Sequence, residues 1–288
     1  MTSLSRDRGF TLVELMISLT LGLLISGAII QLMISNSAVQ SLNRAMTSAQ
    51  ESGRFIVSRM RSEILMTGRY DALSPRLNTT VDVVSEAAFV KNHPIPLPGD
   101  FVNGAAIGAL QGEDGGNDTL VTGFQGDSDC RGYKLGYADS EEFYVVNQYF
   151  VEDMKLKCRG FDGRVLQGQK VAVDNDGDTA YTLLDDVYSF QVQYGIANNV
   201  LAGDESARPV RYLSANLLAA QLATGSKVLT VRIAVLVKGD SELVIEPVPY
   251  FKLLNESAIQ PGEKRFFKQF ETTISLRNVK NFMRSRNI

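Results

Sequence analysis

An uninterrupted apolar stretch near the N-terminus constrains this chain more than any other feature. Residues 15–43 contain no charged side chain, and the most apolar part runs to about Ile34. About 25 residues in an α-helix span roughly 37 Å, which exceeds the roughly 30 Å thickness of a bilayer's hydrocarbon core. The stretch therefore predicts a membrane-spanning helix.

The charges beside this stretch predict its orientation. Arg6 and Arg8 lie on its N-terminal side, and the positive-inside rule keeps the more basic flank of a span in the cytoplasm. We therefore expect a single-pass protein whose N-terminus is cytoplasmic and whose larger remaining part is exported.

Glu14 lies at the start of the apolar segment and needs a physical reason to be there. A carboxylate near the centre of a span costs about 2.5–3.5 kcal/mol on insertion scales, and less near an end. The alternative interpretation is a conventional signal peptide cleaved near Ser26-Gly27-Ala28. The apolar run beyond Ala28 and the carboxylate of Glu14 both argue against it.

The residues around Glu14 resemble a known processing signal. They read Gly9-Phe10-Thr11-Leu12-Val13-Glu14, which is similar to the type III signal of type IV pilins and type II secretion pseudopilins. The resemblance implies that a prepilin peptidase cuts after Gly9 and methylates Phe10. It also implies that Glu14 pairs with the N-terminal amine of a neighbouring subunit. Two opposite charges about 4 Å apart attract by roughly 4 kcal/mol at an effective dielectric near 20, which can offset burial of the carboxylate.

The helical pattern continues beyond the apolar stretch. We expect one helix from Phe10 to about Thr67, with Gly68 as its C-cap; a separate second helix after a hinge near Asn36-Ser37 is the alternative. Apolar residues recur at steps of three and four, which places them on one helical face: Leu42, Met46, Ala49, Gly53, Ile56, Met60 and Ile64.

The remaining chain has a different texture. Residues 71–140 are rich in Gly, Asp, Asn, Ser and Pro, which predicts loops with a few short strands. Residues 214–223 are predicted as a short helix. A long helix packed on an antiparallel sheet is an α+β fold. Five β-rich runs predict the strands: 143–151, 154–158, 187–196, 228–237 and 270–276.

Three further parts of the chain resemble the PilW-type minor pilins, one branch of this family. The first is a helix end, QESGRF at 50–55 followed by MTGRY at 66–70. The second is a central strand, VYSFQVQYG at 187–195, and the third is a C-terminal signature, FFKQFETTISLRN at 266–278. The similarity thus covers most of the chain, with residues 71–140 covered least.

The resemblance implies a pilin-like α+β fold in four parts. Residues 1–9 form a cytoplasmic leader peptide, and residues 10–35 form the transmembrane and filament-core helix. Residues 36–68 form the amphipathic half of that helix. Residues 69–288 form a periplasmic, β-rich globular head with long loops.

The resemblance also implies a function and partners. We expect a minor pilin that takes part in type IV pilus assembly or its initiation and is incorporated at or near the tip. Its partners are other minor pilins, the major pilin, the inner-membrane assembly platform and the prepilin peptidase. It is anchored in the inner membrane and then belongs to the cell-surface pilus. A minor pseudopilin of a type II secretion system and a membrane-anchored adhesin are the alternatives.

Composition argues against an enzyme and against a nucleic-acid-binding protein. The formal net charge of −3 provides no broad basic surface for nucleic acid. The single histidine, His93, lies in Asn92-His93-Pro94-Ile95-Pro96, an extended or turn segment typical of a surface loop. No Ser/His/Asp set, metal-ligand cluster or phosphate-binding loop is apparent, so we expect no catalysis.

The two cysteines predict a disulfide in the exported head. Cys130 and Cys158 are the only cysteines in the chain, and an even count in an oxidising compartment favours a bond between them. Closing this loop contributes roughly 3.6 kcal/mol on the loop-entropy model. Two buried free thiols are the alternative.

An acidic segment predicts a candidate calcium site. Asp174, Asp176 and Asp178 occupy the first, third and fifth positions of an EF-hand-like loop, and Asp185 occupies the twelfth. Thr179 stands where the sixth-position glycine is required. An acidic β-turn between two strands is the interpretation we favour, and we expect no other cofactor.

Overall fold

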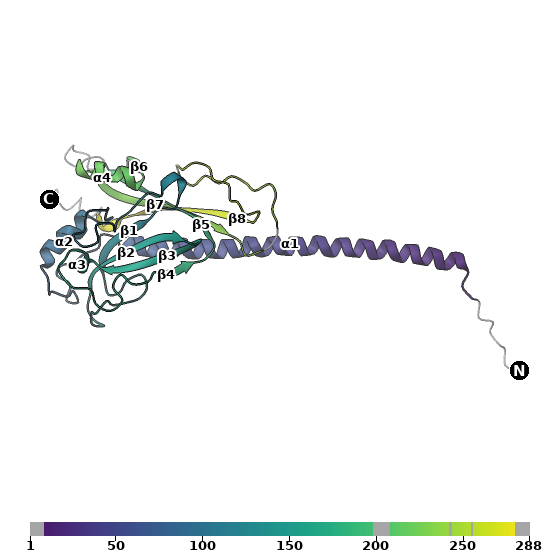
Figure 1. Cartoon of the computed structure of the whole chain (residues 1–288), viewed down its shortest axis with the longest axis horizontal. Helices are drawn as coiled ribbons and strands as arrows, with labels where there is room; N and C mark the ends of the chain where they lie inside the picture. Colours follow the sequence, from purple (N-terminus) through teal and green to yellow (C-terminus); the bar gives the residue numbers. More distant parts are fainter. Residues whose placement is uncertain (1–8, 198–207, 242–243, 255, 280–288) are drawn as a thin grey trace.

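The computed structural model describes residues 9–197, 208–241, 244–254 and 256–279, and the fold is α+β. Figure 1 shows one long helix, α1 (Leu12–Met66), whose C-terminal half lies along two antiparallel sheets. The first sheet has the order β1-β2-β3-β4 and the second the order β6-β5-β7-β8. The strands of the first sheet are β1 (Leu120–Gly126), β2 (Phe143–Glu152), β3 (Lys155–Asp162) and β4 (Tyr181–Leu184). Those of the second are β5 (Val187–Ala197), β6 (Arg211–Leu213), β7 (Lys227–Lys238) and β8 (Phe267–Ser275).

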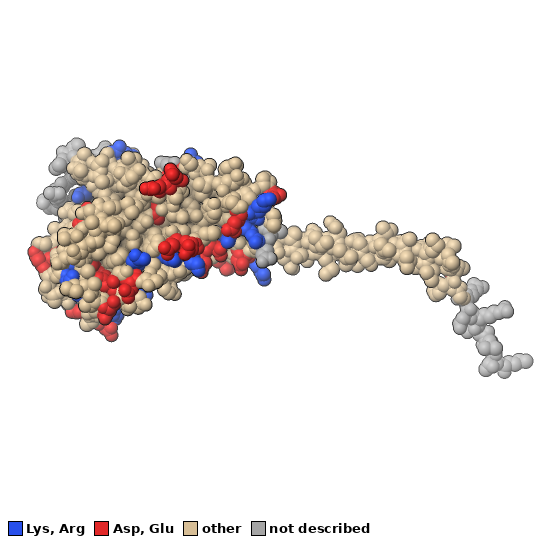
Figure 2. Space-filling view, viewed as in Figure 1, with Lys and Arg blue, Asp and Glu red and all other residues tan. Residues whose placement is uncertain are grey.

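The N-terminal half of α1 projects from the head, and none of the other residues that the structure describes packs against it (Figure 1). Every residue from 9 to 40 is exposed, and residues 12–40 alone extend roughly 44 Å at 1.5 Å per residue. Figure 2 shows charged side chains gathered on the head, whereas the projecting helix is uncharged along most of its length. α1 has no break near Asn36-Ser37, so the single-helix prediction is confirmed.

The C-terminal half of α1 packs through one narrow face. Its buried residues are Ala45, Ala49, Gly53, Ile56, Met60 and Ile64. Five of them were predicted, but Ala45 takes the place expected for Leu42 and Met46. One helical turn before Ala49, the residue on the buried face is Ala45, four positions earlier. Met46 lies beside this face and is 36% exposed.

Two glycines allow α1 to approach the second sheet closely. A Cβ on Gly53 would lie 2.0 Å from the ring of Phe270 on β8. A Cβ on Gly239, just after β7, would lie 2.5 Å from the carbonyl oxygen of Ala45. A side chain at position 53 would displace the Phe270 ring, and one at position 239 would require the backbone of α1 or of the segment after β7 to move.

One hydrophobic cluster joins α1 and both sheets. It includes Ile56 and Met60 of α1, Tyr149 of β2, Phe190 of β5 and Val231 of β7. The predicted strands 143–151 and 154–158 correspond to β2 and β3, which pair antiparallel as a hairpin. The predicted strands 187–196, 228–237 and 270–276 correspond to β5, β7 and β8. The predicted short helix is α4 (Ala215–Ala223).

Residues 71–140 contain more regular structure than predicted. They form α2 (Val83–Asn92), the 3₁₀ turn η1 (Glu113–Gly115) and β1. Asp82 caps α2, because its Oδ1 accepts hydrogen bonds from the N–H groups of Val84 at 3.0 Å and Ser85 at 3.3 Å. The prediction of loops was therefore wrong for α2, whose Asp cap followed by an Ala-containing run is a helix-start signal. A further short helix, α3 (Gly163–Leu166), follows β3 directly.

Candidate processing and assembly site

The candidate cleavage site lies at the far end of α1 from the head. Gly9 and Phe10 precede the first helical residue, and Phe10 is 87% exposed. A Cβ on Gly9 would meet no atom within 4 Å. A peptidase can therefore reach the bond between Gly9 and Phe10 without contact with the head.

Thr11 and Glu14 form a reciprocal cap at the start of α1. Glu14 Oε2 accepts hydrogen bonds from the N–H of Thr11 at 2.9 Å and from its hydroxyl at 3.1 Å. The N–H of Glu14 in turn donates to Thr11 Oγ1 at 3.2 Å. This capping box satisfies two N–H groups that a helix start otherwise leaves open. The carboxylate is exposed, so it is held at the helix end but remains accessible to a cation from another chain.

The surface beyond Glu14 is suited to a lipid or filament environment and not to water. α1 is long and apolar enough to cross a membrane. Its most apolar part is not buried against any other residue that the structure describes. An apolar surface of this extent needs a cover, which a bilayer or neighbouring helices can provide. The chain is thus built as a membrane-anchored protein.

The predicted disulfide is present in the head. Cys130 lies in the turn after β1, Cys158 lies on β3, and their Cα atoms are 6.4 Å apart. The N–H of Cys130 donates to Asn147 Oδ1 on β2 at 3.1 Å. Arg59 Nη2 of α1 donates to the carbonyl oxygen of Cys130 at 2.8 Å. The disulfide turn is therefore fastened to the sheet and to the long helix.

The four aspartates of the candidate calcium site are not brought together. Asp185 pairs with Lys155 at 3.0 Å, and Asp176 Oδ1 accepts the N–H of Asp162 at 2.7 Å. Asp174 and Asp178 are exposed. Among the residues that the structure describes, no group of three or more His, Cys, Asp or Glu side chains could hold a metal ion. The structure thus holds the segment as an acidic turn between β3 and β4, the interpretation favoured from the sequence, and does not direct these carboxylates to one point.

Asn278 is a structural residue whose role sequence reasoning missed. Its Nδ2 lies 3.2 Å from the carbonyl oxygen of Leu65, 3.3 Å from that of Met66 and 3.1 Å from that of Thr67. The last carbonyls of a helix have no partner within the helix, and Asn278 provides one from the end of the chain's C-terminal signature. The sequence marked Asn278 only as part of a resemblance, because its partners lie more than two hundred positions away.

A buried ion pair joins α2 to α3. Arg164 is fully buried, and its Nε lies 2.7 Å from Glu86 Oε2. Arg164 Nη1 also donates to Asn78 Oδ1 at 2.8 Å, and the Tyr70 hydroxyl donates to Glu86 Oε1 at 2.6 Å. Burial and the bond to Glu86 raise the pKa of Tyr70 well above its ordinary value. The groups satisfy one another, so the cluster holds loops in place and presents no reactive atom.

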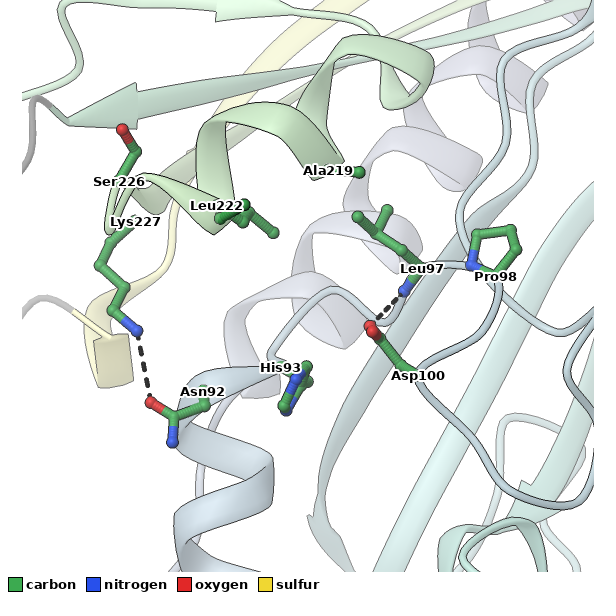
Figure 3. A pocket seen from close by; sticks show the side chains of 10 residues that line it. Asn92, His93, Leu97, Pro98, Asp100, Ala219, Leu222, Ser226 and Lys227 are labelled. Carbon is green, nitrogen blue, oxygen red and sulfur yellow. Dashed lines mark hydrogen bonds between the residues drawn. The ribbon is translucent and has the colours of Figure 1, made fainter.

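His93 lies beside a pocket of about 370 Å³ between the end of α2 and α4 (Figure 3). Its ring stacks on Phe89 with centroids 4.4 Å apart, and its Nδ1 lies 3.1 Å from the Phe89 carbonyl oxygen. Two other lining groups bond within the chain: Asp100 accepts the N–H of Leu97 at 2.7 Å, and Asn92 accepts a hydrogen bond from Lys227 at 3.3 Å. His93 therefore closes the end of α2, in place of the free surface loop that was predicted.

Two protein families match this chain, one over most of the head and one over the N-terminal segment. Residues 142–278 match the family described as Type IV Pilus-assembly protein W. Residues 4–30 match the prokaryotic N-terminal methylation motif. A solved structure of a type IV-like pilin from Thermus thermophilus is similar to this chain, with 14% sequence identity and a TM-score of 0.33. The similarity covers 59% of this chain and 82% of the Thermus chain. No curated protein matches the chain.

The two family matches coincide with the features described above. The methylation motif covers Gly9, Phe10, Glu14 and the exposed apolar helix, and the second match covers β2 to β8 and ends at Asn278. The chain is a type IV pilin of the PilW type that carries an N-terminal methylation signal.

Proposed function

We propose that this chain is a minor pilin that takes part in type IV pilus assembly or its initiation and is incorporated at or near the filament tip. The observation that carries the proposal is Glu14, a single carboxylate on a bare apolar helix, four positions after Phe10. A helix of this kind is stable only where a membrane or other helices cover it. The match to a pilus-assembly family supports the pilus over a type II secretion pseudopilin or an adhesin as the setting.

The proposed life cycle has two locations. The precursor spans the inner membrane once through residues 10–35, with residues 1–9 in the cytoplasm as a leader peptide. Residues 36–68 continue the helix into the periplasm and carry the head, residues 69–288. The prepilin peptidase cuts after Gly9 and methylates Phe10, and the mature subunit then enters the cell-surface pilus.

The proposed assembly step exchanges one partner of Glu14 for another. In the free subunit the carboxylate accepts two hydrogen bonds from Thr11. In the filament it pairs with the N-terminal amine of a neighbouring major or minor pilin. Opposite charges about 4 Å apart attract by roughly 4 kcal/mol at an effective dielectric near 20, which favours the exchange and sets the axial register of the two helices. The inner-membrane assembly platform is the partner that brings the subunits together.

Mass spectrometry of the mature N-terminus tests the proposal. We expect the first residue to be Phe10 carrying one added methyl group. A mature chain that begins at Ile29, or one that retains Met1, contradicts the proposed processing. Isolated pili from the same cells should contain the subunit in low copy number, whereas recovery only with a secretion complex would favour the pseudopilin alternative.

A further inference from the structure

The acidic loop at residues 173–179 lies against β3, and a side chain from another part of the head binds its backbone. Arg131 Nη2 donates to the carbonyl oxygen of Asn175 at 2.6 Å. Arg131 Nη1 lies 3.1 Å from the carbonyl oxygen of Asp178 and 3.4 Å from that of Thr179. Three backbone oxygens of the loop thus converge on one guanidinium.

The same guanidinium is anchored on the sheet. Its Nη2 also donates to the carbonyl oxygen of Gly160 at 3.0 Å, and it pairs with Asp129 Oδ2 at 2.7 Å. The side chains of Arg131 and Asp129 are 1% and 0% exposed. Hydrogen bonds that involve an ionised group are about twice as strong as neutral ones, and burial increases their weight.

The chain on either side of Arg131 fixes the position of its side chain. Cys130 is bonded to Cys158 on β3, and Asp129 Oδ1 accepts the N–H groups of Arg131 at 2.8 Å and Tyr133 at 2.9 Å. A Cβ on Gly160 would lie 2.1 Å from Asp129 Oδ2. The close approach of Asp129 to β3 is therefore possible only because position 160 is glycine.

The arrangement differs from that of a calcium loop. In an EF-hand, aspartate side chains at alternate positions and a backbone oxygen converge on the ion at about 2.3–2.6 Å. Here the backbone oxygens of Asn175, Asp178 and Thr179 face Arg131. The carboxylate of Asp176 is used by the Asp162 N–H.

We propose that Arg131 is the resident cation of this loop and that the loop needs no calcium. A guanidinium supplies several donors in a fixed plane, which suits oxygens spread over the loop and β3 better than those gathered around a point. The loop conformation of a subunit exported to the cell exterior is then independent of the calcium concentration there. This inference concerns the head and does not depend on the proposed role in pilus assembly.

Hydrogen exchange of the full-length protein in detergent, with and without calcium, tests the proposal. The informative amide is that of Gly177, which donates to the Gly160 carbonyl oxygen at 3.1 Å. In the wild type we expect no change in its exchange or in the melting temperature when 1 mM calcium chloride replaces EDTA. A calcium-dependent rise in either protection or melting temperature would overturn the proposal.

Variants at position 131 provide the second arm. In Arg131→Gln we expect residues 173–179 to exchange faster by about tenfold or more, the factor that follows from loss of charge-assisted hydrogen bonds. In Arg131→Lys the exchange rate of residues 173–179 should lie between those of the wild type and Arg131→Gln, because lysine keeps the charge but loses the planar set of donors. Arg159→Gln, which removes an equal charge from β3 where the guanidinium lies over Phe150, should leave the loop unchanged. Wild-type exchange of the loop in Arg131→Gln would overturn the proposal, and the calcium arm decides it if that variant does not fold.

Discussion

The side-chain nitrogen Nδ2 of Asn278 lies 3.1 Å from the carbonyl oxygen of Thr67, the C-cap residue of α1. The contact joins the last part of the chain that matches the pilus-assembly family to the end of the helix that bears the methylation signal. The next residue, Gly68, has a φ of 73°. Its N–H donates to the carbonyl oxygen of Gly123 on β1 at 2.8 Å. The end of α1 is thus held by a strand on one side and by the C-terminal segment on the other.

Asn278→Ala should lower the free energy of unfolding of the head by about 1–2 kcal/mol, because carbonyl oxygens at the end of α1 lose their donor. Asn278→Asp should cost more, because a carboxylate would face three carbonyl oxygens. Urea denaturation of the full-length protein in detergent, followed by near-ultraviolet circular dichroism, measures both. Equal midpoints for the two variants and the wild type would show that the cap has no energetic role.

Glu14→Ala should leave cleavage after Gly9 and head folding intact and should strongly reduce the amount of the subunit in isolated pili. The reason is that the variant cannot pair with the N-terminal amine of a neighbour. Glu51→Ala is the matched control, since Glu51 is an exposed carboxylate on the same helix. Quantitative immunoblotting of sheared pili against whole-cell protein checks the result. Normal incorporation of Glu14→Ala would remove the carboxylate from the mechanism.

The double variant Cys130→Ala/Cys158→Ala should unfold at a lower urea concentration, with a loss of roughly 3.6 kcal/mol on the loop-entropy model. The hydrogen bonds of position 130 to Arg59 of α1 and Asn147 of β2 use its backbone, which alanine keeps, so the loss reports the disulfide itself. A reducing agent should shift the wild type toward the double variant and leave the double variant unchanged. If the reducing agent breaks the disulfide of the wild type but leaves its urea midpoint unchanged, the disulfide does not stabilise the head.

Asp118 should make the stability of the head depend on pH between about 4 and 6. Its Oδ1 accepts the Gly112 N–H at 2.8 Å, and its Oδ2 accepts the Val192 N–H at 2.7 Å. Burial nevertheless raises the pKa of Asp118 to about 6. The folded state therefore binds this proton more tightly than the unfolded chain, so the contribution of Asp118 to stability is largest below its unfolded pKa and is lost as the pH rises through 6.

The comparison of the wild type with Asp118→Asn isolates this effect from all other titrating groups. The free energy of unfolding of the wild type, relative to the variant, should increase by about 2–3 kcal/mol as the pH is lowered from 7 to 4. Urea titrations at intervals of half a pH unit measure the difference. A constant difference across this range would contradict the raised pKa.

The strands that the sequence predicted best are β2, β5 and β7, which are rich in β-branched and aromatic residues. β5 and β7 were expected within one residue of their ends, because Val-, Ile- and Tyr-rich segments bounded by polar residues favour strands wherever they pack. α2 was missed, because a ten-residue helix is marginal on its own and depends on packing against the head. Val90 of α2 is fully buried, which is a tertiary fact that no local pattern contains.

The sequence by itself determined the character of α1 and its N-terminal signal. A long run of uncharged apolar residues favours a helix in an apolar environment, independently of how the head folds. The signal of Gly9, Phe10 and Glu14 can be identified from the order of these residues along the chain. Only the tertiary structure decided which cation meets the acidic loop, which residue caps the end of α1 and how Glu86 meets Arg164. Each of these contacts joins residues far apart in sequence, and hydrogen bonds depend on positions and angles that exist only after the two sheets and α1 have packed together.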